Sequence, residues 1–174
     1  ELQWALQADQ LGTGHAVMQA MSSIDIKKPQ KLILVLYGDV PLINFSTLSN
    51  LVQQANENKL SILTLVTKNP AGLGRIVRND LGEITAIVEE NDANKEQKQI
   101  KEINTGIMII PATKLNTWLT SLGNNNAQGE YYLTDIVAMA AADDHCAISA
   151  MVIENEHEVQ GVNDKAQLAG LERK

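Results

Sequence analysis

The sequence predicts an α/β fold in which a mixed and mostly parallel sheet is flanked by helices. Continuous apolar runs, such as Lys31–Tyr37 and Leu60–Val66, have the composition of strands covered on both faces. These runs alternate along the chain with segments whose apolar residues recur at helical spacing, which is typical of helices packed on a parallel sheet. The chain shows no internal repeat and no linker-like segment, so we expect one domain.

The first half of the chain supplies two helices and two strands. A tight turn at Gly12–Gly14 precedes a helix over His15–Met21, and the strand Lys31–Tyr37 follows. Ser46 is a suitable N-cap for a helix that continues to Asn58. The second apolar strand comes directly after that helix.

A hairpin is predicted next, because Gly74–Arg78 and Glu83–Val88 flank a turn that contains glycine. This hairpin breaks the regular alternation and makes the sheet mixed. Asn91–Gln99 is polar and is expected to be a short helix or loop on the surface. The remaining predicted elements are a strand at Ile103–Ile110, a helix at Ala112–Leu122, a helix capped by Thr134 and ending at Ala142, a strand at Ala147–Ile153 and a helix at Asp164–Glu172 for which Asp164 is the candidate cap.

Composition excludes several classes of protein. With 174 residues, of which 44% are hydrophobic, the chain can form a buried core without disulfides, and its single cysteine, Cys146, has no partner in the chain. A net charge of −7 argues against binding nucleic acid. No apolar run reaches the roughly 18 residues of a membrane span. We therefore expect a soluble protein of a reducing compartment, the cytoplasm.

Polar residues at strand ends are the first candidates for a site, because open α/β sheets bind ligands beyond the carboxyl ends of their strands. Asp39 follows a predicted strand and is either a ligand for a hard cation such as Mg²⁺ or the cap of a turn. Asn104 lies within an apolar strand, where its amide needs either an internal hydrogen bond or a polar ligand. Glu89 and Glu90 follow the strand that ends at Val88, and either is compatible with a plain surface position.

Seven short motifs occur in one order along almost the whole chain. Together they resemble the uridylyltransferase (pyrophosphorylase) domain of the bifunctional N-acetylglucosamine-1-phosphate uridylyltransferase/glucosamine-1-phosphate acetyltransferase family. The motifs are Leu6–Ala16 (LQADQLGTGHA), Tyr37–Leu42 (YGDVPL), Gly74–Ile76 (GRI), Ile87–Glu89 (IVE), Glu102–Ile107 (EINTGI), Asn124–Tyr132 (NNNAQGEYY) and Glu158–Asn163 (EVQGVN).

The resemblance implies a Rossmann-like nucleotidyltransferase fold and a role for each matching position. It implies that Asp39 is the catalytic residue and, with Asn163, coordinates Mg²⁺. The implied substrate-binding residues are Gln7, Gly12 and Thr13 for uracil, Tyr37 and Gly38 together with Asp39 around the ribose and the metal, and Gly74, Glu89 and Asn104 for the N-acetylglucosamine group.

The implied reaction is uridylyl transfer from UTP to N-acetylglucosamine 1-phosphate. The sugar phosphate attacks the α-phosphorus, pyrophosphate leaves, and UDP-N-acetylglucosamine forms as a precursor for peptidoglycan and lipopolysaccharide. Such chemistry depends on positioning and on charge neutralisation more than on an acid–base residue.

The sequence departs from this family at both ends. The family begins with a Gly-rich loop of the form L-x-x-G-x-G-T-R-M, which cradles the UTP phosphates, and this loop is absent from the 174 residues. The hexapeptide-repeat acetyltransferase domain, through which the parent is expected to form a homotrimer, is also absent. We therefore expect residues 1–174 to be an N-terminally truncated uridylyltransferase domain with little activity alone. The alternatives are a non-catalytic module that binds nucleotide sugars and a sibling sugar-nucleotide pyrophosphorylase.

Overall fold

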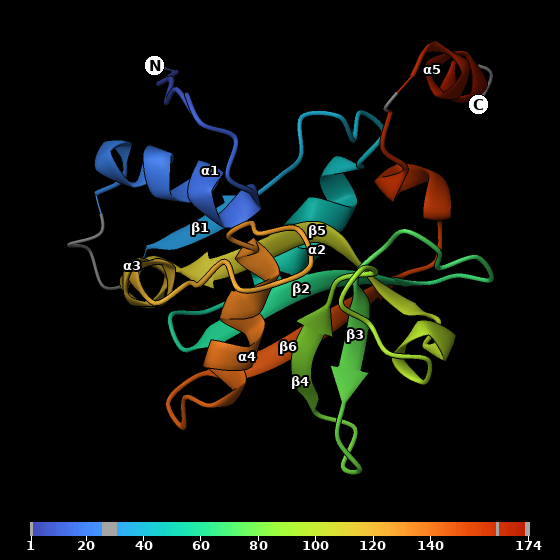
Figure 1. Cartoon of the computed structure of the whole chain (residues 1–174). Helices are drawn as coiled ribbons and strands as arrows, with labels where there is room; N and C mark the ends of the chain where they lie inside the picture. The colour runs from blue at the N-terminus through green and yellow to red at the C-terminus, as the bar shows by residue number, and fades with distance from the viewer. Residues whose placement is uncertain (1, 26–30, 163, 173–174) are drawn as a thin grey trace.

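Six strands form one mixed sheet in the computed structural model, which describes residues 2–25, 31–162 and 164–172 (Figure 1). The strands lie in the order β4-β3-β5-β2-β6, and β1 also pairs with β5. The predicted α/β class with a mixed sheet is therefore confirmed. The strands are β1 (Leu32–Val35), β2 (Lys59–Val66), β3 (Arg75–Arg78), β4 (Ile84–Val88), β5 (Glu102–Pro111) and β6 (Ala147–Ile153).

The strand pairings differ from the prediction. Among the described strands, β2 and β6 pair in parallel, whereas β5 runs antiparallel to β1, β2 and β3, and β3 runs antiparallel to β4. The prediction of a mostly parallel sheet therefore holds for strand direction, since β1, β2, β3 and β6 run the same way, but it is wrong for pairing, since four of these five pairings are antiparallel. Apolar runs indicate that a strand is buried on both faces, but they carry no information about its direction. Two neighbouring parallel strands are joined by a long crossover, which is usually a helix. Between β2 and β5 the chain forms no such helix but the β3–β4 hairpin and a short 3₁₀ turn.

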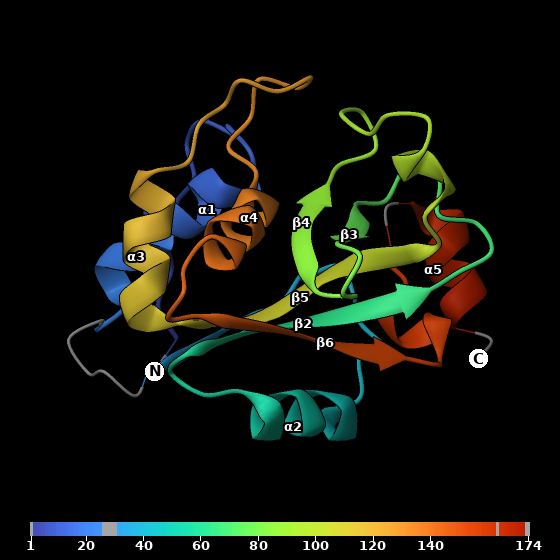
Figure 2. The same cartoon turned by 90° about the horizontal axis from the view of Figure 1, so that it is seen from below.

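Helices cover both faces of the sheet, with α2 on one face and α1, α3 and α4 on the other (Figure 2). The side chains of β5 divide accordingly. Met108 and Ile110 belong to the core under α3 and α4, whereas Ile107 and Ile109 pack with Leu51 of α2. The prediction of burial on both faces is confirmed for β2, whose side chains divide between the same two cores. It is wrong for β1, which among the described strands pairs on one edge only and whose Leu34 is exposed. The helices are α1 (Thr13–Ala20), α2 (Phe45–Gln54), α3 (Ala112–Thr120), α4 (Ile136–Ala141) and α5 (Lys165–Leu171).

Two predicted helix caps are wrong and one is confirmed. Asn44, and not Ser46, is the N-cap of α2, and the α2 N-terminus is satisfied by a distant group: Glu158 accepts hydrogen bonds from the Asn44 N–H at 3.4 Å and the Thr47 hydroxyl at 2.6 Å. Thr134 does not cap α4, because its hydroxyl bonds elsewhere. The Asp164 carboxylate does cap α5, accepting from the backbone N–H of Gln167 at 2.7 Å.

In the described part of the chain, no helix combines the length and the apolar character that crossing a bilayer requires. The longest described helix, α2, has 10 residues. A membrane-spanning helix needs about 20.

A two-pronged ion pair ties β3 to β5. The Arg78 guanidinium donates to both carboxylate oxygens of Glu102, at 2.9 Å each, and the Thr64 hydroxyl donates to the same carboxylate at 2.9 Å. The hydrogen bond from Arg78 is the main reason that the pKa of Glu102 lies below its ordinary value of 4.5, and the bond from Thr64 adds to the effect. These bonds therefore favour the ionised carboxylate.

This lowered pKa makes part of the stability dependent on pH. The contribution is fully present above the unfolded-state pKa of Glu102 and is lost as the pH falls through the lowered folded-state value. We expect Glu102→Gln to unfold about 1 kcal/mol more easily at pH 7, since the pair is partly exposed. We also expect this variant to lose less free energy of unfolding than the wild type between pH 5 and pH 3. Urea denaturation at both ends of that range measures the difference. The same acid-induced loss in both proteins would contradict this assignment.

Candidate functional site

Five of the predicted site residues meet in one cavity of about 270 Å³. They come from four places in the chain: Tyr37 and Asp39 follow β1, Gly74 precedes β3, Glu89 follows β4, and Asn104 lies in β5. The wall is completed by Val40, Gly72, Leu73, Thr105, Gly106, Val159 and Gly161.

A gap in the pairing of β5 opens this cavity. Along one edge, β5 pairs with β1 from Met108 to Pro111 and with β3 at Ile103. Asn104, Thr105 and Gly106 lie between these two pairings, have no strand partner on that edge among the described residues and line the cavity. The carboxyl end of β1 and the start of β3 therefore meet over a short stretch of open β5.

Gly106 provides a flat surface for the ring of Tyr37. A Cβ added to Gly106 would lie 1.9 Å from Cε2 of Tyr37, and the φ angle of +82° at Gly106 is one that side chains rarely allow. Burial raises the pKa of Tyr37, and the nearby carboxylates of Glu89 and Asp39 raise it further. The hydroxyl therefore stays protonated and can donate a hydrogen bond. Gly106 is not among the site residues predicted from the sequence, although a glycine inside a strand often marks a close approach.

The side chain of Asn104 makes an internal hydrogen bond and also lines the cavity. Its Oδ1 accepts from the Gly106 N–H at 3.0 Å, and its own N–H donates to the Gly74 carbonyl at 2.9 Å. The side-chain nitrogen, Nδ2, donates to no other described residue. The internal hydrogen bond is therefore present, and the amide N–H groups are left as donors at the cavity wall.

Glu89 stands between two hollows and is held by a residue of the α3–α4 connection. The hydroxyl of Thr134 donates to Oε1 of Glu89 at 2.8 Å. On the other side, a Cβ at Gly74 would lie 3.3 Å from Oε2 of Glu89, so the absence of a side chain at Gly74 lets the carboxylate approach. Thr134 is a second residue whose place near the site was not predicted.

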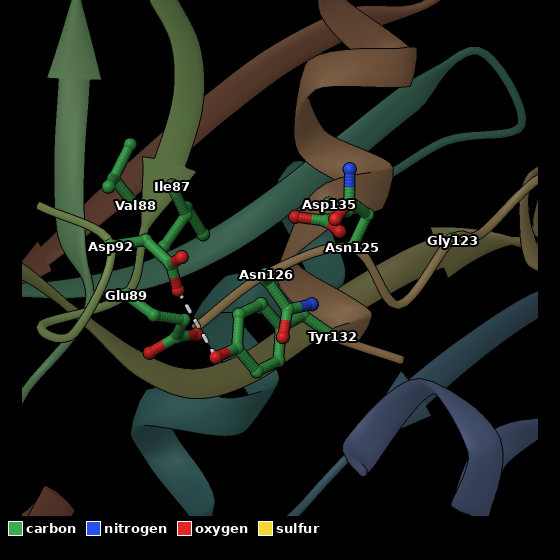
Figure 3. Close-up of a pocket in the computed structure, with 9 residues that line it drawn as sticks. All are labelled: Ile87, Val88, Glu89, Asp92, Gly123, Asn125, Asn126, Tyr132 and Asp135. Atoms are coloured by element: carbon green, nitrogen blue, oxygen red, sulfur yellow. Dashed lines mark hydrogen bonds between the residues drawn. The ribbon is translucent and has the colours of Figure 1, made fainter. Parts of the chain in front are cut away.

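The second hollow has a volume of about 340 Å³ and is rich in acidic and amide groups (Figure 3). The hydroxyl of Tyr132 donates to Oδ2 of Asp92 at 3.2 Å. Burial raises the pKa of Asp135, and the carboxylates of Glu89 and Asp92 add to this effect. Such a surface suits a neutral group with many hydroxyls better than an anion. The lining residues are Ile87, Val88, Glu89, Asp92, Gly123, Asn125, Asn126, Tyr132 and Asp135.

Gln7, Gly12 and Thr13 form a separate group that lines neither hollow. Gly12 has a φ of +106°, and a Cβ there would lie 2.7 Å from the Tyr131 carbonyl oxygen. Thr13 Oγ1 accepts from the Leu133 N–H at 3.0 Å, and the side-chain amide of Gln7 donates to the Gly12 carbonyl at 3.0 Å. The glycine turn is therefore tight because it packs against residues 131–133.

The segment 131–134 connects this group to the cavity. Its first residue, Tyr131, accepts from the Gly14 N–H at 2.7 Å, and its last, Thr134, donates to Glu89. Gln7, Gly12 and Thr13 thus lie at one end of this segment and Glu89 at the other. The predicted sugar-binding residues thus line one cavity. The predicted uracil-binding residues lie outside that cavity, and Gly12 and Thr13 among them contact the same segment, residues 131–134, that bonds to Glu89.

Asp39 fits the role of a cation ligand. It is exposed in the turn after β1, its carboxylate bonds to no other described group, and its backbone carbonyl accepts from the Val162 N–H at 2.8 Å. A hard cation that keeps several waters needs few protein ligands. No cluster of three acidic, histidine or cysteine side chains suited to a metal occurs in the described ranges. Gly38 precedes Asp39 in the same turn, and Asn163 lies outside the described residues.

Comparison with protein families matches residues 1–156 to the family described as nucleotidyl transferase. Curated relatives named bifunctional protein GlmU are similar to most of the chain. That of Pseudomonas putida (strain KT2440) is 51% identical over 99% of this chain and 37% of the relative. Those of Francisella philomiragia and Dechloromonas aromatica are 53% and 54% identical, over 96% and 99% of this chain and 36% and 37% of each relative. The chain thus spans a little over a third of the length of these proteins.

A solved structure of UDP-glucose pyrophosphorylase complexed with UDP-glucose has a similar fold. The TM-score is 0.67 at 16% sequence identity, and the match covers 97% of this chain and 65% of the other. At this identity the likeness shows the fold alone.

Proposed function

Because the chain belongs to the nucleotidyl transferase family, we propose that it transfers the uridylyl group of UTP to N-acetylglucosamine 1-phosphate. A phosphate oxygen of the sugar phosphate forms the new bond to the α-phosphorus, the bond from that phosphorus to the bridging oxygen breaks, and pyrophosphate leaves. The observation that carries the proposal is the cavity in which Tyr37, Asp39, Gly74, Glu89 and Asn104 meet.

The cavity supports binding of the sugar. Glu89 offers a carboxylate that accepts hydrogen bonds from hydroxyls, while Asn104 offers an amide that donates them. The glycine at position 74 lets a ligand approach the backbone closely. Acceptors and donors arranged in this way distinguish a neutral sugar from a flat apolar group.

The base is assigned to the group around Gln7. Since the Gly12 carbonyl holds the nitrogen of the Gln7 amide, the amide oxygen points away from that carbonyl. A carbonyl oxygen in this position accepts a hydrogen bond from a ring N–H such as that of uracil. Gly12 and Thr13 provide backbone groups beside it.

Magnesium is assigned to Asp39, with Asn163 as the second ligand. The ion, when bound, would neutralise phosphate oxygens during in-line displacement. Asp39 holds its position through its backbone bond to Val162, and Tyr37 stays neutral beside it. Neither lysine nor arginine is among the described residues that line the cavity, so the cations that a triphosphate requires come from other groups.

A comparison of substrates tests the function. We expect the natural gene product to release pyrophosphate from UTP with N-acetylglucosamine 1-phosphate in preference to dTTP and to glucose 1-phosphate. A preference for either of those two substrates would indicate a sibling pyrophosphorylase instead. Binding of UDP-N-acetylglucosamine without any pyrophosphate release would indicate a non-catalytic binding module. Supply of cell-wall precursors, a cytoplasmic location and a trimeric parent remain predictions alongside this proposal.

Asn104→Ala should weaken binding of the sugar phosphate while sparing UTP. The variant loses the amide donor at the cavity wall and also the acceptor for the Gly106 N–H. We expect the KM for N-acetylglucosamine 1-phosphate to rise about tenfold, with the KM for UTP unchanged. Steady-state kinetics measure both, and thermal unfolding reports the separate loss of the internal bond. An unchanged KM for the sugar phosphate would remove Asn104 from the site.

A further inference from the structure

Two adjacent glutamates at the end of β4 have different partners. Glu89 faces the cavity and accepts from Thr134, whereas Glu90 bonds to the loop that precedes β3. The two carboxylates therefore reach different surroundings, although they are neighbours in the chain. The proposed function uses Glu89 and leaves Glu90 without a role.

Glu90 and Arg75 enclose the backbone of that loop in a ring of hydrogen bonds. Oε2 of Glu90 accepts from Nη2 of Arg75 at 2.6 Å and from the backbone N–H of Gly72 at 3.1 Å. Nη1 of Arg75 donates to the Leu73 carbonyl. The ring therefore runs from Gly72 through the two side chains to Leu73, and Gly74 follows it directly.

The loop held in this way is one wall of the candidate sugar site. Gly72, Leu73 and Gly74 all line the 270 Å³ cavity. The Gly74 carbonyl is fixed separately, because it accepts from the Asn104 N–H at 2.9 Å. The Leu73 N–H also donates to the Pro70 carbonyl at 3.2 Å. Each of these three consecutive residues thus has at least one backbone group held by a described partner, and the ring supplies two of the four bonds.

The burial of Arg75 indicates that its position is specific. Its side chain is 2% exposed, and its buried Nε has no hydrogen-bond partner among the described residues. A buried cation gains little net stability from an ion pair when part of it stays unsatisfied. Lys98 lies 3.8 Å from the other oxygen of Glu90 and is more exposed. The pair is therefore better explained by the geometry that it imposes than by stability alone.

We propose that Glu90 and Arg75 are positioning residues that set the Gly72–Gly74 wall of the cavity and so determine affinity for the sugar phosphate. The role rests on the proposed function, because it concerns the sugar side of that reaction. Neither residue is placed in contact with the substrate. Both act through the backbone of the loop.

The test compares Glu90→Gln with Glu96→Gln in the natural gene product. Glu96 is an exposed glutamate six residues further along the same loop, so its variant removes the same charge without touching the ring. Glu90→Gln should raise the KM for N-acetylglucosamine 1-phosphate about tenfold, leave kcat and the KM for UTP within about twofold, and speed amide exchange in residues 71–74. Glu96→Gln should change none of these. Glu90→Asp, which shortens the side chain, should lie between the wild type and Glu90→Gln.

The outcomes separate the two ideas. A folded Glu90→Gln protein with unchanged KM values would overturn the positioning role, as would an equal rise in both KM values. If the wild type transfers no uridylyl group, the proposed function fails, and amide exchange at residues 71–74 then decides alone whether the ring holds the loop. Exchange that is the same in Glu90→Gln and Glu96→Gln would refute the ring in that case.

Discussion

Replacing Asp39 with alanine should reduce magnesium-dependent uridylyl transfer by at least about 100-fold. Asp39 is the one carboxylate of the cavity that bonds to no other described group, and it lies in the turn directly after β1. Without it, a cation at this edge of the sheet loses its charged protein ligand, and the phosphates lose charge neutralisation during displacement. Pyrophosphate release as a function of magnesium concentration measures the loss.

Asp80→Ala is the matched control for this experiment. Asp80 is an exposed aspartate in the turn between β3 and β4, so its removal changes the net charge equally without touching the cavity. We expect that variant to keep full activity. An Asp39→Ala protein as active as Asp80→Ala would remove Asp39 from the site, and partial rescue at high magnesium would support its role as a ligand.

Gly106→Ala should lower both stability and activity. The new Cβ would lie 1.9 Å from the Tyr37 ring, and the backbone φ of +82° adds strain for any side chain. We expect a loss of about 3 kcal/mol in the free energy of unfolding, from backbone strain and the clash together. We also expect weaker substrate binding, because the ring must leave the cavity wall. Urea denaturation and steady-state kinetics measure the two effects.

Gly82→Ala is the control that separates the clash with the Tyr37 ring from the backbone strain. Gly82 has nearly the same backbone angle, +80°, but a Cβ there meets nothing within 4 Å. The difference between the two variants therefore measures the clash with Tyr37. The double variant Gly106→Ala/Tyr37→Ala should regain part of the lost stability. Equal losses in Gly106→Ala and Gly82→Ala would show that the ring is free to move and is not held by this glycine.

Patterns of burial were predictable from the sequence, whereas strand pairing was not. The continuous apolar runs of β2 and β5 predict a sheet covered on both faces, since alternate side chains of each strand face opposite sides of the sheet and most of them are apolar. The antiparallel course of β5 depends on how the chain returns from the β3–β4 hairpin, and composition does not record this. The N-cap of α2 was missed for a similar reason, because the carboxylate that satisfies it belongs to Glu158, more than a hundred residues away.

The candidate site was predictable where a polar residue interrupts an apolar pattern or where a motif resembles a known family. Asp39 and Asn104 stand out in the first way, and Gly74 and Glu89 entered through the resemblance. The sequence predicts Thr134 as a helix cap, and this prediction is wrong because its hydroxyl instead bonds to Glu89. That bond joins segments 45 residues apart, so no local pattern indicates it. The pairing of Arg75 with Glu90 could not be predicted for the same reason. Two charged residues in separate segments resemble ordinary surface residues until the hairpin brings them together.

The most direct test of the site is an NMR titration of the natural gene product with UDP-N-acetylglucosamine. We expect saturable shifts of the backbone amides of Gly74, Asn104 and Gly106, which line the cavity. We also expect UDP-glucose to produce weaker shifts at the same residues. Saturable binding that leaves these three amides unchanged would contradict the assignment of this cavity.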